Sequence, residues 1–215
     1  GSAGCVLAAR LSEDPATSVC LLEAGGNDRD PLIRMPLGIA LLVPRRIHNW
    51  AFETIPQPGL AGRRGFQPRG KTLGGSSSIN AMVYTRGHRS DYDEWAALGN
   101  AGWSYADVLP YFRRAENNER IADDFHGQGG PLNVADPRSP SSFSELWLAA
   151  AEQQGMQRNA DFNGAEQEGV GLYQLTQKNG ERWSAARAYL EPSRHRSNLV
   201  VRTRAHATRV VLEDQ

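Results

Sequence analysis

The residues with the clearest capacity for chemistry lie between Gly70 and Arg86, in the run GKTLGGSSSINAMVYTR. The adjacent Gly74 and Gly75 let the backbone pass close to a bulky ligand and adopt positive φ angles. Three serines follow, and such small residues leave backbone N–H groups that can donate to an anionic oxygen or a ring carbonyl. An ordinary Gly/Ser loop is the alternative. The unbroken apolar segment that follows, residues 79–84, favours a ligand-binding segment inside a core.

A second glycine motif stands at the start of the chain, where Gly1-Ser2-Ala3-Gly4 leads into an apolar helical pattern. It matches the back half of a G-x-G-x-x-G turn, with a short buried parallel strand expected at 18–23 and Glu23 about 20 residues after the glycines. The helix N-terminus would face a pyrophosphate and the carboxylate would accept ribose hydroxyls, which disfavours a 2′-phosphorylated nucleotide. Packing glycines in a plain strand–helix pair are the alternative, but Gly25-Gly26 at the strand end favours a nucleotide site.

Together the two motifs resemble one family, the glucose–methanol–choline (GMC) oxidoreductases, and within it the choline-dehydrogenase-like branch. The family signature is matched from Gly70 to Asn80 and onward through Tyr84, Arg86 and Gly87. The resemblance spans nearly the whole chain and implies an α/β fold (α+β with insertions): a Rossmann-like FAD-binding domain, truncated at both ends, plus part of a substrate-binding domain. Because the chain opens inside a motif, we expect an N-terminal fragment of a longer enzyme.

The resemblance also assigns the cofactor and its ligands. It implies FAD, held by residues from both glycine motifs and from one late position: Gly1, Ser2, Gly4, Glu23, Thr72, Gly75, Ser76, Asn80, Ala81, Met82, Val83 and Ala207. Some relatives attach FAD covalently through a histidine at the position of Ile79. Isoleucine forms no such bond, so we expect non-covalent FAD.

The reaction that the resemblance implies is oxidation of a small-molecule alcohol, with hydride passing to flavin N5. The family's catalytic histidine lies in the C-terminal half, so we expect no catalytic residue in this chain and no turnover by it alone. Two other hypotheses stay open: an FAD-containing lyase on the same scaffold, and a non-catalytic gene fragment. Redox cycling of the flavin with an alcohol distinguishes the oxidoreductase from the lyase.

Bulk composition excludes several classes of function. The chain is 40% hydrophobic and 22% charged with a formal net charge of +0, and it holds no apolar run long enough to span a bilayer. No global field would attract nucleic acid or an anionic membrane. We expect both cysteines, Cys5 and Cys20, to be small buried hydrophobes in a reducing compartment. We expect a bacterial-type cytoplasmic location, with peripheral membrane attachment as the alternative; the electron acceptor is not indicated.

The remaining polar residues are interpreted as structural. Asp91, Asp93 and Glu94 suit the first turn of a helix capped by Ser90 better than a metal site, and we expect no metal ligands in the chain. His48 and His88 are interpreted as loop and structural residues. His126 lies in a loop that resembles the family's entrance segment, and we expect it to have no orienting partner and no catalytic role.

These patterns give a domain plan. Residues 1–140 would form the FAD-binding domain with its FAD-covering extension and entrance loop, 141–195 part of the substrate-binding domain, and 196–215 the returning strands. The expected helices lie at 1–11, 37–43, 90–95, 104–112, 142–151 and 184–190, the last stopped by Pro192. The expected strands lie at 18–23, 50–54, 169–177, 198–203 and 207–213, with a hairpin tip at 59–65.

Overall fold

The structure is a computed structural model that describes residues 1–212. Its backbone divides into two compact units, the first made of residues 1–81 together with the segment from 181 onward, and the second of residues 82–180. These boundaries differ from those expected at 140 and 195, because the segment after residue 81 and the entrance loop pack within the second unit. The functional roles assigned to the expected domains stay predictions. No helix among residues 1–212 has the length and apolar character needed to cross a membrane.

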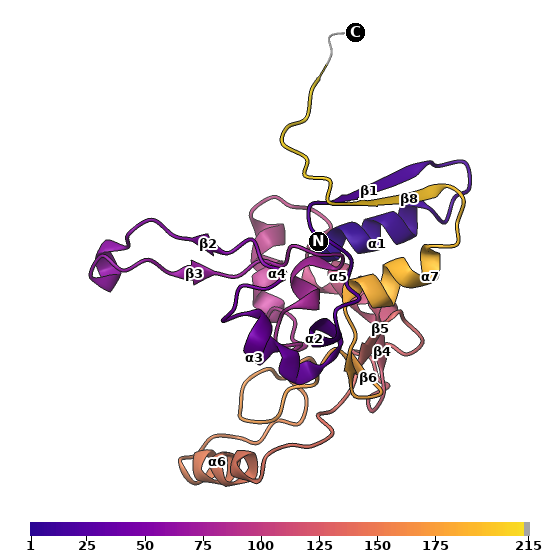
Figure 1. Cartoon of the computed structure of the whole chain (residues 1–215). Coiled ribbons are helices and arrows are strands. Elements are labelled where there is room, and N and C mark those ends of the chain that lie inside the picture. The colour runs from indigo at the N-terminus through magenta and orange to yellow at the C-terminus, as the bar shows by residue number, and fades with distance from the viewer. Residues whose placement is uncertain (213–215) are drawn as a thin grey trace. The chain divides into compact units, whose positions relative to one another are not determined.

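The first unit contains the two ends of the described chain (Figure 1). Its regular elements are α1 (Ser2–Leu11), β1 (Val19–Glu23), α2 (Pro31–Arg34), the 3₁₀ helix η1 (Pro36–Gly38), α3 (Ile39–Leu42), β2 (Phe52–Glu53), η2 (Pro58–Leu60), β3 (Phe66–Gln67), η3 (Gly75–Ser78), β7 (Glu181–Arg182), the π-helix η4 (Ala186–Leu190), α7 (Glu191–Ser193) and β8 (Leu199–Thr203).

The core of this unit forms around a parallel pair, β1 with β8, in which Val19 lies opposite Leu199 and Glu23 opposite Thr203. Figure 1 shows α1 and α7 beside this pair. Helix α1 buries its small residues, and the core they build comprises Cys5, Ala8, Leu73, Ala185, Ala186, Leu190 and Leu199. Small side chains on α1 let it pack closely on both the strands and η4, as a strand–helix unit of an α/β fold requires. The predicted helix and strand at 1–23 are confirmed.

One expectation about this pair is wrong. Cys5 is buried, but Cys20 is exposed on β1. Side chains alternate along a strand, and Cys20 shares its face with Leu22, which is 48% exposed. Helix α1 covers the opposite face, and no other described element covers this one. The two cysteines therefore occupy different environments.

The segment between β1 and the central motif forms short helices and a hairpin. The short helix predicted at 37–43 is present as η1 followed directly by α3, and Leu42 is completely buried with Ile33 and Ile79. Strands β2 and β3 pair antiparallel, and η2 forms the turn between them, so the predicted hairpin is confirmed. The His48 Nε2–H donates to Asp30 Oδ2 at 2.9 Å, a structural role that agrees with its interpretation as a loop histidine.

The second unit holds the remaining elements: α4 (Arg89–Ala97), α5 (Tyr105–Ala115), β4 (Glu116–Asn118), β5 (Leu132–Val134), α6 (Ser142–Gln153) and β6 (Gln177–Lys178). Strands β4 and β5 pair in parallel, with Glu116 opposite Leu132. Strand β4 follows α5 directly, with no loop between them. The buried side chains of Glu116, Asn118 and Asn133 make this small sheet polar inside.

One helix begins elsewhere than the sequence indicated. Helix α4 is capped by His88, which accepts from the Ser90 N–H, while Asp91 accepts from the His88 N–H. A histidine is an unusual N-cap, so the pattern pointed to the next serine instead. Helix α6 begins at Ser142, as predicted, and Ser141 is its N-cap. Ser104 and Asp107 form a capping box at the start of α5, within the helix predicted at 104–112.

Three further elements depart from expectation. Residues 169–176 form only isolated bridges, because Val170 and Leu175 meet different partner segments and Gly169 has a φ of 126°. Gln177 opens the two-residue strand β6. Residues 207–212 form no strand, since no described segment lies beside them to pair with; Glu213 lies outside the described residues. Pro192 does not stop the helix after Ser184. It stands in the first turn of α7, where its missing N–H is tolerated, and the helix continues to Ser193.

Candidate cofactor site

The two glycine motifs, more than 70 residues apart in sequence, meet in the first unit. Gly75 lies against Gly1 so closely that a Cβ on Gly75 would be 2.5 Å from the Gly1 Cα. The Ser2 hydroxyl donates to the Gly74 carbonyl at 3.0 Å and accepts from the Ser77 N–H at 3.2 Å. The N-terminus of α1 and the 3₁₀ turn η3 therefore form one continuous backbone surface.

Gly25 and Gly26, which follow the end of β1, also lie against the central motif. A Cβ on Gly25 would meet the Lys71 carbonyl oxygen at 1.9 Å, so the segment before η3 crosses directly over it. Thr72 is completely buried there, and its hydroxyl donates to the Asn27 carbonyl at 2.8 Å. A Cβ on Gly26 would meet nothing within 4 Å, as is also the case for Gly1. Close backbone contacts at Gly25 and Gly75 thus alternate with open space beside Gly1 and Gly26 along this edge of the unit.

Glu23 and the segment after β8 complete this edge. The Glu23 side chain is buried, accepts from the Gly25 N–H at 2.8 Å and lies 3.5 Å from the Gly1 nitrogen. After β8 the Arg204 N–H donates to the Gly25 carbonyl and the Ala205 N–H to the Glu23 carbonyl, at 2.8 and 2.9 Å. These bonds hold the chain beside the Glu23 end of β1, and the exposed Ala207 follows two residues after Ala205.

The central motif ends in an exposed segment. Ser76 accepts from the Gly70 N–H at 3.1 Å, which closes the loop before η3. Asn80 and Ala81 are exposed, whereas Ile79, just before them, is 2% exposed and packs in the core. Met82 and Val83 belong to the second unit, where Met82 is buried with a φ of 62° and Val83 is 45% exposed. Their predicted place in the cofactor site stays a prediction.

The residues of the first unit fit a dinucleotide with a flavin. Glycine backbones form a surface in which any side chain at 25 or 75 would overlap the crossing chain, while open space remains beside Gly1 and Gly26. A helix N-terminus provides N–H donors for a pyrophosphate, and Glu23 provides acceptors for hydroxyls. Gly1, Ser2, Gly4, Glu23, Thr72, Gly75, Ser76, Asn80, Ala81 and Ala207 would hold the group from this unit. Gly4 contributes through packing, since its Cβ would meet Leu21 Cδ1 at 3.3 Å.

Sequence reasoning missed Arg182, which ties the central motif to the rest of this unit. Its side chain is 1% exposed. Its Nη1 donates to the Asn80 carbonyl at 2.7 Å and to Asn80 Oδ1 at 2.8 Å, and its Nε donates to the Ile33 carbonyl at 2.8 Å. An arginine between two polar residues gives no pattern that distinguishes a buried side chain from a surface one.

The second unit contains a buried charged network that sequence reasoning also missed. Arg86 donates to Glu116 at 2.7 Å, with both side chains at most 2% exposed. His126 is buried and lies between Glu116 Oε1 and Asp161 Oδ2, each at 3.0 Å from a ring nitrogen. The expectation that His126 has no orienting partner is therefore wrong, because the loop folds back onto β4 and buries the ring.

The charges in this network are set by one another. Burial alone would lower the pKa of His126, but hydrogen bonds to Asp161 and Glu116 raise that pKa to about 9. Burial would raise the pKa of Glu116, but the His126 and Asn118 hydrogen bonds and the Arg86 charge lower it. His126 is thus an imidazolium at neutral pH, held between two carboxylates.

One side of this network has the composition of a cation site. Asp123, His126 and Asp161 each offer a ligand atom, and these atoms lie within 4.8 Å of one another. The imidazolium proton occupies the place that a metal would take on His126, so binding would require its loss. The expectation of no metal ligand stays a prediction.

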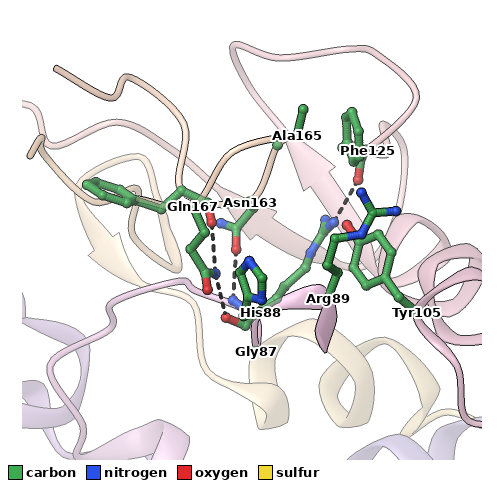
Figure 2. A pocket seen from close by; sticks show the side chains of 11 residues that line it. Gly87, His88, Arg89, Tyr105, Phe125, Asn163, Ala165 and Gln167 are labelled. Atoms are coloured by element: carbon green, nitrogen blue, oxygen red, sulfur yellow. Dashed lines mark hydrogen bonds between the residues drawn. The ribbon is translucent and has the colours of Figure 1, made fainter. Parts of the chain in front are cut away.

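A small cavity of about 20 Å³ lies at the start of α4 in the same unit (Figure 2). The 86–88 segment forms one wall, where Asn163 accepts from the Arg86 N–H at 2.7 Å and Gln167 donates to the Arg86 carbonyl at 3.0 Å. Figure 2 shows Asn163 and Gln167 beside this segment, with Arg89 and Tyr105 further along. Its volume corresponds to about one water molecule.

Comparisons with known proteins cover the whole chain. A family model described as GMC oxidoreductase matches residues 1–215. The chain is 53% identical over 216 residues to an alcohol dehydrogenase (acceptor) of Pseudomonas putida. It is 45% identical over 214 residues to an oxygen-dependent choline dehydrogenase of Sinorhizobium medicae (strain WSM419). Each alignment takes in 100% of this chain, which spans 39% of the length of these relatives.

Solved structures share the fold. A pyridoxine 4-oxidase from Mesorbium loti is 38% identical with a TM-score of 0.94, over 100% of this chain and 42% of its own. An FAD-dependent oxidoreductase from Chaetomium thermophilum is 32% identical with a TM-score of 0.86, over 94% of this chain and 36% of its own. The predicted Rossmann-like α/β fold is confirmed.

Proposed function

The chain belongs to the GMC oxidoreductase family, and from this premise we propose that it is the FAD-binding N-terminal portion of an enzyme that oxidises the CH–OH group of an alcohol. FAD is the cofactor of this domain. The alcohol dehydrogenase and choline dehydrogenase relatives support an alcohol or amino-alcohol substrate. We expect the catalytic base to lie outside residues 1–215, so these residues alone should bind FAD without oxidising alcohol.

The observation that carries this proposal is the contact between Gly75 and Gly1. A backbone-to-backbone approach that would place a Cβ 2.5 Å from a Cα requires glycine, and it joins the N-terminus of α1 to the motif that the family uses along the flavin. A plain nucleotide-binding domain needs the first motif only. The junction of both motifs favours a flavin dinucleotide.

Each part of the site has a distinct binding role in this proposal. The N–H groups at the start of α1 would donate to the pyrophosphate, and Glu23 would accept from the ribose hydroxyls. The backbone beside Ala207 would lie against the adenine, and Thr72 through Val83 along the flavin. When bound, FAD supplies the hydride acceptor at N5. The chain's own contribution is to orient that group and keep water from it.

We further propose that FAD is bound without a covalent link. Ile79 occupies the position at which some relatives carry a linking histidine, and it is 2% exposed in an apolar cluster with Ile33 and Leu42. No nucleophile is available at that position. Acid precipitation of the flavin-loaded protein should leave all flavin in the supernatant, and flavin that stays with the pellet would contradict this point.

The function itself is tested on the full-length parent protein by its visible absorption spectrum. The protein is purified without added flavin and scanned before and after anaerobic addition of choline and of a panel of simple alcohols. We expect oxidised-flavin bands that one alcohol bleaches. Flavin bands that no alcohol bleaches would support the lyase hypothesis instead. A colourless protein that also fails to take up added FAD would overturn the assignment of Gly70–Asn80.

A further inference from the structure

Arg182 is a buried cation that holds the end of the central motif. It stands on the two-residue strand β7, about 100 residues after the motif, with 1% of its surface exposed. Four hydrogen bonds from two of its nitrogens reach oxygens of Ile33, Ser77 and Asn80. The bond to Asn80 Oδ1 fixes which end of that amide faces the guanidinium. This guanidinium therefore constrains the Asn80 side chain, alongside the bond that the Asn80 N–H donates to the Ser76 carbonyl at 2.9 Å.

No carboxylate neutralises this charge within the described part of the chain. Every bonded partner of Arg182 is a carbonyl or amide oxygen, and none of the ion pairs found among residues 1–212 includes it. Its Nη2 is buried without a hydrogen-bond partner. Burial lowers the pKa of Arg182 to about 10, which still leaves it charged at neutral pH.

Two other arginines with buried or half-buried side chains differ in this respect. Arg86 pairs with Glu116, and Arg187, five residues beyond Arg182, pairs with Glu181. A buried charge without a counter-ion is unfavourable because its solvation is not replaced. An unpaired cation is less unfavourable when a negatively charged group binds nearby, and the proposed function places a flavin along Asn80.

We propose that Arg182 is a positioning residue of the flavin site: it fixes Asn80 through the carbonyl and the amide oxygen, and its unneutralised charge favours the reduced over the oxidised form of the bound flavin. The inference rests on the proposed function. Two-electron reduction adds negative charge to a flavin, and a fixed cation in a low-dielectric surrounding stabilises that charge. The positioning effect acts on affinity for both forms, whereas the charge effect acts on the ratio of the two.

Two substitutions separate these effects in the full-length, FAD-loaded protein. Arg182→Lys keeps the charge but loses the planar fork that reaches Asn80 and Ile33 together. Arg182→Met removes both. Arg187→Gln is the matched control, because it removes an arginine of the same segment whose charge is already paired. The readouts are the dissociation constant of FAD for the apoprotein and the two-electron midpoint potential.

We expect both Arg182 variants to bind oxidised FAD about tenfold more weakly. Arg182→Met should also lose about tenfold in its preference for the reduced form, which lowers a two-electron midpoint potential by about 30 mV. Arg182→Lys should keep the wild-type potential, and Arg187→Gln should keep both quantities. A folded Arg182→Met protein with wild-type affinity and potential would overturn the proposal.

A second experiment covers the case in which Arg182→Met does not fold. Asn80→Ala removes the amide acceptor and leaves Arg182 in place, so combining it with Arg182→Lys forms a double-mutant cycle in FAD affinity. Coupled losses support the positioning role, and strictly additive losses overturn it. A wild-type protein that binds no FAD would instead contradict the proposed function, which keeps the two failures apart.

Discussion

Gly75 combines a positive φ of 57° with backbone contact to Gly1, which makes it the most specific residue of the candidate site. We predict that Gly75→Ala weakens FAD binding at least tenfold and lowers the free energy of unfolding by about 2 kcal/mol. The added methyl would overlap the Gly1 Cα, so η3 or α1 must shift. Fluorescence titration of the apoprotein with FAD and urea denaturation measure the two effects.

Gly59→Ala is the control for this substitution. A Cβ on Gly59 would meet nothing within 4 Å, and its φ is not in the left-handed region. It should leave both quantities unchanged within error. If Gly75→Ala bound FAD like the wild type, the junction of the two glycine motifs would not be the cofactor site.

His126 makes stability depend on pH in a definite direction. Its pKa rises from 6.5 to about 9 in the folded protein, so its imidazolium is stabilised by Asp161 and Glu116. A raised pKa contributes stability that is complete below about pH 6.5 and is lost as pH rises through about 9. We predict a fall in the free energy of unfolding on the order of 3 kcal/mol over that window.

Urea denaturation at pH 6.5, 8 and 9 tests this, with His126→Gln as the comparison. The variant should be less stable at pH 6.5 and should show a much flatter profile from 6.5 to 9. A variant that keeps the full wild-type slope would assign the alkaline loss to another group. Toward acid, the lowered pKa values of Glu116 and Asp161 predict a second loss as pH falls below their ordinary values.

At the scale of elements, the two serines at the start of α6 give a direct test of capping. Ser141 accepts from the Phe143 N–H at 3.3 Å, whereas Ser142 is already inside the helix. We predict that Ser141→Ala lowers the opening free energy of α6 by about 1 kcal/mol. Ser142→Ala should change it by less than about 0.3 kcal/mol. Hydrogen exchange of the α6 amides measures both, and equal effects would contradict the assigned cap.

These elements also indicate what the sequence could predict. Helix α1, strand β1 and the β2–β3 hairpin follow from local patterns, since periodicity, prolines and glycines act within a few residues. The predicted strand at 169–177 failed because strand pairing depends on a partner, and Val170 and Leu175 find different ones. Cys20 was placed wrongly for a related reason: alternation gives two faces, and the sequence does not say which is covered.

The site divides in the same way. Gly75 and Glu23 could be identified from the sequence because their residue types and spacing belong to motifs with a known backbone geometry. Arg182 and the His126 network were not, since each depends on contacts over more than 30 residues. Long-range burial of a polar side chain leaves no local pattern.

At the scale of the whole molecule, the candidate site draws on three distant stretches of the first unit: residues 1–26, 70–80 and 204–207. Hydrogen bonds at Gly25 and Glu23 join the last stretch to the first, and the Ser2 hydroxyl joins the first to the second. A ligand that touches all three links them thermodynamically. FAD at 100 times its dissociation constant would stabilise the folded unit by about 2.7 kcal/mol.

We therefore predict that FAD slows amide exchange in all three stretches together, by up to about a hundredfold where exchange requires opening of the unit. Mass-spectrometric hydrogen exchange of the full-length protein with and without FAD measures this. Helix α6 of the second unit is the internal control and should be unchanged apart from any global effect. Protection at 1–26 and 70–80 without protection at 204–207 would remove Ala207 from the site, while protection at 1–26 alone would reduce the site to a simple nucleotide-binding turn, in which the central glycine motif has no part.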